Sequence, residues 1–178
     1  MKFTEQKIKG VFLIEAEPFV DFRGVFRRHF CQNEFKAHGI NPRVSQCNVI
    51  ENPKKGTLRG FHYQPYPYSE SKTFTCFRGS FYFAVVDLRH KSKTYLKWQG
   101  FKLDENTRVT LSVPAGCANA SLSLKDNSLI HYYVSNFYRP GVEKCVRYND
   151  PLFRFEWPIK PIIISEKDLS HPDFKPAT

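Results

Sequence analysis

The sequence predicts an all-β protein, a single antiparallel sandwich or barrel for which a jelly roll is the leading candidate. Twelve prolines and nine glycines are spread through the 178 residues, which favours many short strands over long helices. Aromatic residues make up 16% of the chain, and such residues are enriched in strands. A domain of this length buries about 70% of its unfolded surface. We therefore expect residues 1–178 to form one domain with its own core.

Nine segments have the composition and patterning of strands. In chain order they cover residues 11–14, 25–30, 44–50, 57–63, 73–77, 81–88, 95–103, 108–113 and 129–134. Residues that tolerate or preset turn dihedral angles separate them, as at 52–56 (NPKKG), 104–106 (DEN) and 114–116 (PAG). This spacing is typical of hairpins and strand corners.

Two short stretches are predicted to be helical, and both lie outside the predicted strands. One covers residues 32–38 and ends near Gly39. The other is a turn opened by Ser165, whose hydroxyl can cap Lys167 or Asp168. The Pro-containing ending, 171–178, is expected to fray or to dock on a partner.

The net charge of +10 favours an anionic partner. Lysines and arginines occur in scattered pairs rather than in one long run, and no nucleic-acid module pattern is present. A small polyanion is therefore preferred to nucleic acid. No apolar run approaches the roughly 20 residues that a membrane helix needs, and residues 1–10 lack the apolar part of a signal peptide, so no membrane partner is expected.

The five cysteines are odd in number and never spaced as Cys-x-x-Cys, which argues against a disulfide framework and against a zinc knuckle. They are Cys31, Cys47, Cys76, Cys117 and Cys145. We expect buried free thiols in a reducing cytoplasm.

The densest polar segment is 58–64 (LRGFHYQ). Strand alternation places His62 and Gln64 on one face and Arg59 and Phe61 on the other. If the first face lines a barrel mouth, His62 lies inside it, although a lone strand histidine is often structural. Gln64 is a poor metal ligand, and the other histidines show no ligand spacing, so neither a metal site nor a cofactor is predicted.

The chain resembles the dTDP-4-dehydrorhamnose 3,5-epimerase family over residues 10–174. The resemblance rests on the order and spacing of many short motifs. They are DFRG at 21–24 with Phe26, LRGFHYQ at 58–64, Lys72 before Arg78-Gly79, VDLR at 86–89, PAG at 114–116, Tyr132, Tyr138 with Pro140, Asn149-Asp150, Trp157-Pro158 and SEKD at 165–168. The resemblance implies a cupin-type jelly roll that needs no cofactor.

The family inverts carbons beside the ketone of a nucleotide-linked 4-keto-6-deoxy sugar by enolisation. The resemblance assigns the base to His62, since imidazole has an unperturbed pKa of about 6.5. Asp168 would hold the other ring nitrogen, and Lys72 would face the developing oxyanion. Tyr132 matches the acid on the opposite side, with a pKa expected to be lowered by nearby cations. Without the resemblance, Lys72 would be a surface charge and Tyr132 a wall residue.

The resemblance also implies substrate ligands. Arg23 and Arg59 match diphosphate ligands, for which guanidinium forks are suited, although each could instead form a surface ion pair. The remaining matches to substrate-binding positions are Phe26, Gln46, Asn48 and Tyr138. Asp87 fits the family pattern too, but it could simply pair with Arg89 or the backbone.

Two positions depart from the family pattern. Asn119 stands where a histidine is usual, which alters a contact near the phosphate or sugar and leaves open whether C3, C5 or both are inverted. Arg28 replaces the usual glutamate that accepts the thymine N3 hydrogen. A guanidinium suits a base with an acceptor edge, so the sugar is expected to be linked to CDP or GDP in place of dTDP.

Two alternative functions stay open on the sequence: a 3,4-ketoisomerase, and a catalytically silent cupin that binds a nucleotide sugar. The resemblance further implies a homodimer with strand exchange near the N-terminus, a role that segment 10–14 could serve.

Overall fold

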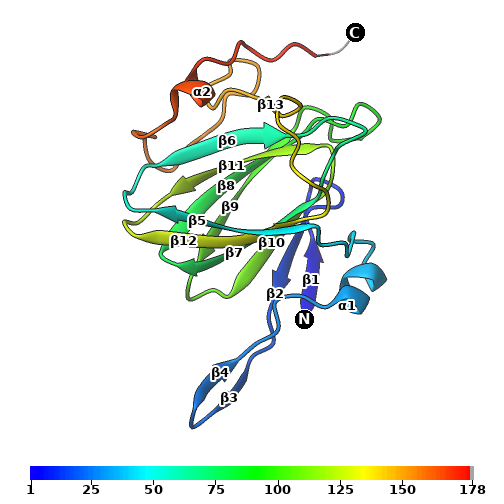
Figure 1. Cartoon of the computed structure of the whole chain (residues 1–178), viewed down its shortest axis with the longest axis vertical. Coiled ribbons are helices and arrows are strands. Elements are labelled where there is room, and N and C mark those ends of the chain that lie inside the picture. The colour runs from blue at the N-terminus through cyan, green and yellow to red at the C-terminus, as the bar shows by residue number, and fades with distance from the viewer. Residues whose placement is uncertain (177–178) are drawn as a thin grey trace.

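The computed structural model describes residues 1–176, and it consists of two antiparallel sheets that face each other, with a hairpin projecting from one end (Figure 1). The predicted all-β class with short peripheral helices is confirmed. Residues 177 and 178 of the predicted domain lie outside the described part.

One sheet has six strands in the order β1-β2-β10-β7-β12-β5. Their bounds are β1 Lys2–Glu5, β2 Phe12–Glu15, β10 Val109–Val113, β7 Lys72–Arg78, β12 Ser128–Val134 and β5 Gln46–Asn52. The other sheet has five strands in the order β13-β6-β11-β8-β9. Their bounds are β13 Lys144–Cys145, β6 Leu58–Tyr63, β11 Cys117–Ser123, β8 Ser80–Asp87 and β9 Trp98–Asp104. The hairpin consists of β3 Phe19–Asp21 and β4 Gly24–Phe26, and the helices are α1 Gln32–Ala37 and α2 Glu166–Leu169.

The main core lies between the two sheets. Phe81 and Phe83 of β8 are fully buried there, beside side chains of β7, β10 and β12. The alternate residues of β8, Ala84 and Val86, belong to a second buried cluster. Because successive side chains of a strand point to opposite faces, β8 is buried on both sides of its sheet.

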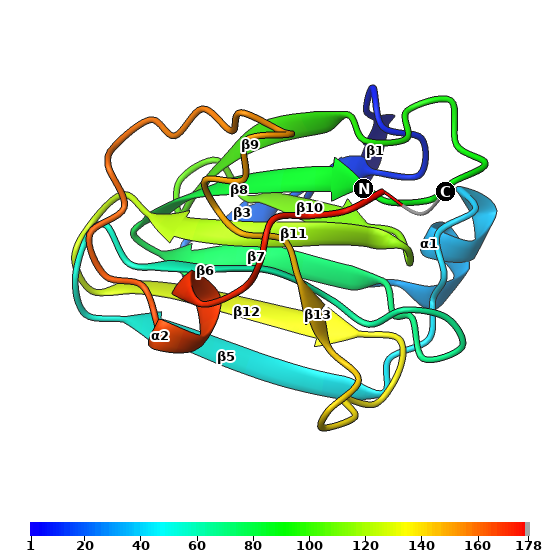
Figure 2. The ribbon, with the colours of Figure 1, turned by 90° about the horizontal axis from the view of Figure 1, so that it is seen from above.

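The second cluster forms where the C-terminal segment covers the outer face of the five-stranded sheet, as Figure 2 shows from above. Phe61 of β6 stacks on Phe155 with ring centroids 4.2 Å apart, and Trp157 packs beside both. These three rings, here called the aromatic layer, hold the C-terminal segment on the sheet. The helix α2, which follows in the chain, contacts β6.

The described part of the C-terminal tail docks on its own chain. The backbone N–H of Phe174 donates to Asp150 Oδ2 at 2.6 Å, and its ring packs on Phe153. Arg147 forms an ion pair with Asp173. The expectation that this ending frays or docks on a partner is therefore wrong for residues 171–176.

Strand prediction failed mainly where apolar alternation is weak. β11 was missed because its sequence, CANASLS, is made of small and polar residues, yet every residue of it is buried. Ala118 and Ala120 are small enough to pack beneath the aromatic layer. β1, β3 and the two-residue β13 were also missed, and the predicted strand 25–30 ends at Phe26, where its pairing with β3 ends.

The cysteine prediction is partly correct. All five thiols are free, and Cys76 and Cys117 are buried. Cys31 and Cys145 are only half-buried, and Cys47 is exposed because it faces outward from β5. Within residues 1–176, neither helix has the length and apolar character required to cross a membrane.

Candidate active site

A cavity of about 510 Å³ opens between the two sheets beside α2. His62 of β6 lines it from the five-stranded sheet, and Tyr132 of β12 lines it from the six-stranded sheet. Lys72, Arg59 and Asn119 complete the set of predicted site residues around it, together with Asp168. The fold therefore brings an imidazole and a phenol from opposing sheets into one cavity.

His62 is held by Asp168, as predicted. The His62 Nε2 lies 2.8 Å from Asp168 Oδ1, although the two residues are separated by 106 positions in the chain. Asp168 Oδ2 accepts the backbone N–H of Gly60, and the Ser165 hydroxyl caps α2 by accepting the Asp168 N–H. With Nε2 facing the carboxylate, Nδ1 is the ring nitrogen left to accept a proton.

Asp168 is ionised in this arrangement. Burial alone would raise the pKa of its carboxyl, but the hydrogen bonds from His62 and Gly60 outweigh burial, and the net pKa is lowered. The carboxylate is therefore charged at neutral pH and can stabilise an imidazolium when His62 takes up a proton.

The predicted alternation of β6 is wrong, because the strand contains a bulge. Asn119 pairs with His62 and Ser121 with Arg59, so three steps along β6 match two along β11. Arg59 and His62 consequently both line the cavity, whereas Phe61 faces the aromatic layer. The sequence signal for this irregularity was Gly60, which has a φ of +118°.

Tyr132 is the wall residue opposite His62, and its ring stacks on Phe74 at 5.3 Å. Burial raises the pKa of its phenol, and the nearby carboxylates of Glu143 and Glu70 add to this rise, while Arg59 opposes it. The expectation that nearby cations lower this pKa is met by Arg59 alone, and the net direction is opposite because burial and the two carboxylates outweigh it. A protonated phenol is the form that can donate a proton.

Lys72 carries its ammonium group to the same cavity. Its Nζ donates to the carbonyl of His62 at 3.2 Å and lies 3.1 Å from Glu70 Oε1. Glu70 is itself buried and accepts from Gln64 Nε2 at 2.6 Å. Sequence reasoning missed Glu70, although its position two residues before Lys72 would place both on one face of an extended segment.

A second cavity, of about 310 Å³, continues from the first and shares His62, Lys72 and Tyr132 with it. Gln46, Asn48 and Tyr138 line this part, as their predicted pocket positions require. Gln46 Oε1 accepts the backbone N–H of Tyr138 at 2.8 Å. Glu143, which was not predicted, also lines it and pairs with Lys167 at 2.7 Å.

Asn119 is 8% exposed and lies directly across the strand pair from His62. Its side-chain Oδ1 is buried and has no hydrogen-bond partner among the described residues. An unsatisfied buried carbonyl costs about 1–3 kcal/mol.

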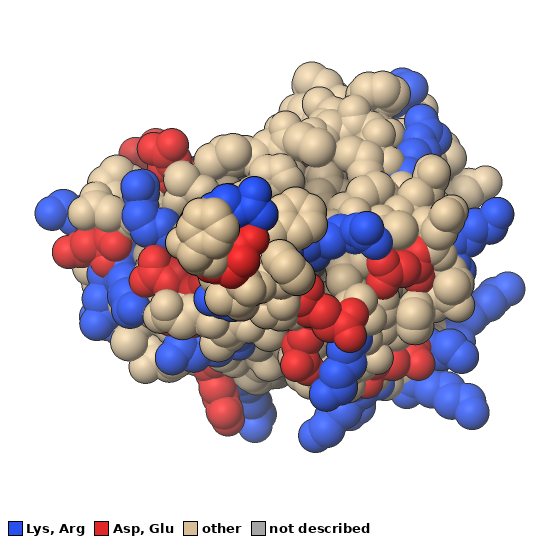
Figure 3. All heavy atoms as spheres, turned by 90° about the horizontal axis from the view of Figure 1, so that it is seen from below, with Lys and Arg blue, Asp and Glu red and all other residues tan. Residues whose placement is uncertain are grey.

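Three predicted ligands lie away from the cavity of their own chain. Arg23 and Phe26 belong to the projecting hairpin, where Arg23 pairs with Asp21 at 2.6 Å. Arg28 pairs with Glu34 of α1 at 3.1 Å. Figure 3 views this end of the molecule, where acidic and basic side chains are interspersed among uncharged ones. Within one chain these three residues do not join the site.

Comparison with known proteins gives one consistent result. The model of the dTDP-4-dehydrorhamnose 3,5-epimerase family matches residues 5–176. The chain is 33% identical to the dTDP-4-dehydrorhamnose 3,5-epimerase of Mycobacterium tuberculosis, over 98% of this chain and 88% of the relative.

Solved structures agree with this match. The enzyme of the same name from Elizabethkingia anophelis superposes with a TM-score of 0.94 at 31% identity, over 98% of this chain and 96% of the other. The enzyme from Bacillus anthracis, solved with TDP and PPi bound, has a TM-score of 0.93 at 29% identity, over 97% and 99% of the two chains.

Proposed function

The chain belongs to the dTDP-4-dehydrorhamnose 3,5-epimerase family, whose members are isomerases, and on this basis we propose that it inverts C3, C5 or both of a nucleoside-diphosphate 4-keto-6-deoxy sugar by enolisation. The observation that carries the proposal is the placement of His62 and Tyr132 on opposing sheets around one cavity. The proposed reaction uses the side chains of the protein and needs neither a metal nor a redox cofactor.

In this mechanism the C4 ketone acidifies the neighbouring C–H bond. His62 Nδ1 removes that proton, and the electron pair moves onto the C4 oxygen to form an enolate, which the Lys72 ammonium stabilises. Tyr132 then donates its proton to the opposite face of the same carbon. The imidazolium loses its proton to solvent and the phenolate regains one, so the inversion leaves the protein unchanged.

The diphosphate of the substrate is assigned to Arg59 within the chain and to Arg23 of a second chain. Arg59 lines the cavity, where its Nε donates to Asn52 Oδ1 and its remaining N–H groups are available. The hairpin that carries Arg23 and Phe26 stands off its own body with Phe22 99% exposed, which is unfavourable for an isolated chain. A homodimer in which each hairpin reaches the partner's cavity accounts for both observations.

The base of the nucleotide is proposed to be cytosine or guanine. Because Arg28 lies outside the cavity of its own chain, this proposal places it at the partner's site, where its donors match the acceptor edges of cytosine and guanine rather than the N3 hydrogen of thymine. Calorimetry with dTDP, UDP, CDP and GDP measures the choice, and a clear preference for dTDP contradicts it.

The five free thiols support a reducing, cytoplasmic setting.

Incubation with nucleotide 4-keto-6-deoxy sugars in deuterated water tests the function. We expect solvent deuterium at C3, C5 or both, accompanied by inversion, in a product that NMR identifies. A catalytically silent binding protein, which the unusual Asn119 favours, would bind the sugar without incorporating deuterium, and a 3,4-ketoisomerase would move the carbonyl to C3. Either of these outcomes rejects the epimerase proposal.

A further inference from the structure

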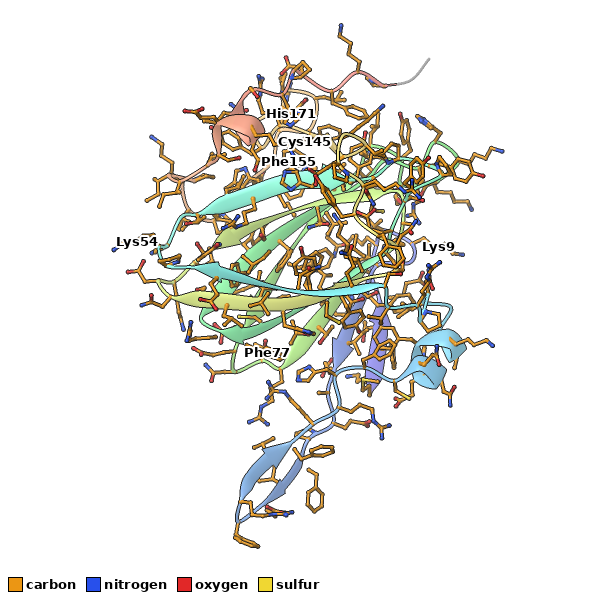
Figure 4. All side chains as sticks on the ribbon, viewed as in Figure 1. Lys9, Lys54, Phe77, Cys145, Phe155 and His171 are labelled. Carbon is orange, nitrogen blue, oxygen red and sulfur yellow. The ribbon has the colours of Figure 1, made fainter. Side chains whose placement is uncertain are left out.

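Cys145 lies beside His62 and Asp168, a position that no sequence motif indicates. It is the partner of His62 in the antiparallel pairing of β13 with β6. Directly opposed residues of such a pair place their side chains on the same face of the sheet. Figure 4 shows Cys145 at β13, close to β6 and beneath the tail that carries His171.

Three different ligand types therefore meet at one point. The imidazole of His62, the thiol of Cys145 and the carboxylate of Asp168 each present a ligand atom within 4.8 Å of the other two. They come from β6, β13 and α2, so no short motif in the sequence encodes the cluster. Histidine spacing alone predicts no metal site, because only one of these three ligands is a histidine.

We propose that this cluster is an inhibitory site for Zn²⁺ or a similar thiophilic divalent cation. Nitrogen, sulfur and oxygen ligands together suit Zn²⁺, and three protein ligands leave the fourth tetrahedral position for water. Binding requires the His62–Asp168 contact to open slightly, from 2.8 Å, so that the ion lies between Nε2 and Oδ1. It also requires Cys145 to release its hydrogen bond to the Val146 carbonyl.

Inhibition follows from the chemistry of imidazole, and this step rests on the proposed function. A metal ion on Nε2 leaves the neutral ring with its proton on Nδ1. Nδ1 is the nitrogen that must accept the substrate proton, so the metal-bound ring cannot act as the base. The ion also occupies Asp168, which then no longer stabilises an imidazolium. The same three residues thus cannot bind the ion and support proton abstraction together.

The thiol is protonated when the site is empty. Burial raises the pKa of Cys145 to about 12, and the carboxylates of Asp168 and Glu143 contribute to that rise. A bound dication reverses the local charge and deprotonates a coordinating thiol. The ion competes with the His62–Asp168 contact and with the hydrogen bond from Cys145 to the Val146 carbonyl, and both can re-form when the ion leaves, so we expect a reversible site rather than a permanent structural one.

Metal binding can be measured without any substrate. The reference protein is Cys31→Ser/Cys47→Ser, which removes the exposed thiol and one half-buried thiol outside the cluster and leaves the buried Cys76 and Cys117. Titration of this protein with CoCl₂ is expected to give a sulfur-to-cobalt charge-transfer band in the near ultraviolet, which ZnCl₂ abolishes in a 1:1 ratio. Adding Cys145→Ser, or Cys145→Ala, is expected to remove the band and weaken zinc binding at least tenfold by calorimetry.

The proposal is overturned if the reference protein gives no such band, or if both Cys145 variants, shown to be folded by circular dichroism, bind zinc as tightly as the reference. The inhibitory step has a separate readout. ZnCl₂ is expected to inhibit deuterium exchange by the reference protein, with recovery on adding a chelator, and to inhibit the Cys145→Ala protein at least tenfold more weakly. Equal inhibition of both proteins rejects the inhibitory step but not the metal site, which the cobalt band tests separately. If the proposed function is wrong, the cobalt band is still expected, because it needs no substrate.

Discussion

At the scale of single residues, the orientation of His62 depends on Asp168. The carboxylate accepts from the imidazole and from the Gly60 backbone N–H, and it is buried against β6. An amide at this position has the same shape but can present an N–H to the ring and cannot stabilise an imidazolium.

Asp168→Asn is therefore expected to lower kcat by roughly 10²–10⁴-fold, with a much smaller change in KM. Steady-state kinetics of the variant measure this, and thermal unfolding shows whether the fold is kept. The matched control is Glu166→Gln, an exposed residue of the same helix, which should keep its kcat. A kcat for Asp168→Asn within a few-fold of the unsubstituted enzyme would show that the carboxylate does not act through His62.

The sequence supported the choice of individual site residues better than their surroundings. His62 and Asp168 lie in recognisable motifs, whereas Lys72 and Tyr132 could be chosen only because the resemblance to a family assigned them roles. Glu70 had no motif of its own, and its pairing with Lys72 appears only when the two side chains enter the same cavity. Cys145 was unpredictable for a similar reason, since a two-residue strand such as β13 leaves no periodic signal.

At the scale of elements, the bulge in β6 decides what the cavity contains. Gly60 occupies a φ of +118°, and a Cβ built there would meet the Asn119 carbonyl oxygen at 2.6 Å and the Ala120 Cα at 2.7 Å. Both contacts are backbone atoms of β11, so they cannot move aside cheaply. The glycine thus allows Arg59 and His62 to line the same cavity.

Gly60→Ala is expected to lower the free energy of unfolding by about 3 kcal/mol and to lower kcat, because β6 and β11 must separate. Chemical denaturation measures the first effect. Gly141→Ala is the matched control, since Gly141 also has a positive φ, of +80°, but open space around its Cβ position. Its loss should be only about 1 kcal/mol, from backbone strain alone. Equal losses in the two variants would argue against a steric role for Gly60.

A second element-scale feature is the end of β8, where Asp87 organises the following loop. Its carboxylate accepts hydrogen bonds from Arg89, Ser92 and Thr94. The pairing with Arg89 was one of the two expectations for Asp87. Burial alone would raise the pKa of Asp87, but these hydrogen bonds outweigh burial and hold the pKa at about 2.

Since the folded pKa lies below that of an unfolded aspartate, Asp87 stabilises the fold fully above about pH 4, and this contribution is lost as the pH falls towards 2. Denaturant unfolding from pH 6 to pH 2.5 should show this loss, and Asp87→Asn should lower stability by about 2 kcal/mol at pH 6. The variant should also show a shallower decline with acid. An unchanged pH dependence in Asp87→Asn would show that other carboxylates account for the decline.

The strands that sequence patterns predicted well are those with one apolar face or a dense apolar run, such as β8 and β12. β11 was not predicted because its composition is not typical of a strand. It is a central strand because it pairs with β6 on one side and β8 on the other. The bulge in β6 escaped for a related reason: strict alternation is the default of an extended chain, and only contact with β11 shows where it fails.

At the scale of the whole molecule, the hairpin is the part that a single chain leaves without a role. Arg23 and Phe26 match substrate ligands in the resemblance, yet they lie outside the cavity of their own chain. The proposed dimer gives each cavity a hairpin from the partner, so that every site combines residues of two chains.

A mixing experiment tests this shared site. Arg23→Ala and His62→Ala are each expected to be nearly inactive, but co-refolding equal amounts should restore about a quarter of the activity, since half the dimers are hybrids with one intact site of two. The control pairs His62→Ala with Tyr132→Phe, whose changes fall in the same chain's half of the site and should not complement. No recovery in the first mixture, with dimers present by light scattering, would place Arg23 outside the partner's site.

In the proposed mechanism His62 and Tyr132 act on opposite faces of one carbon, and one comparison in deuterated water tests this most directly. NMR of the sugar reports deuterium content and configuration at C3 and C5 for the unsubstituted enzyme, His62→Ala and Tyr132→Phe. We expect exchange with inversion in the first, neither in the second, and exchange without inversion in the third. Exchange at the full rate in His62→Ala, or full inversion by Tyr132→Phe, would contradict the assignment of base and acid.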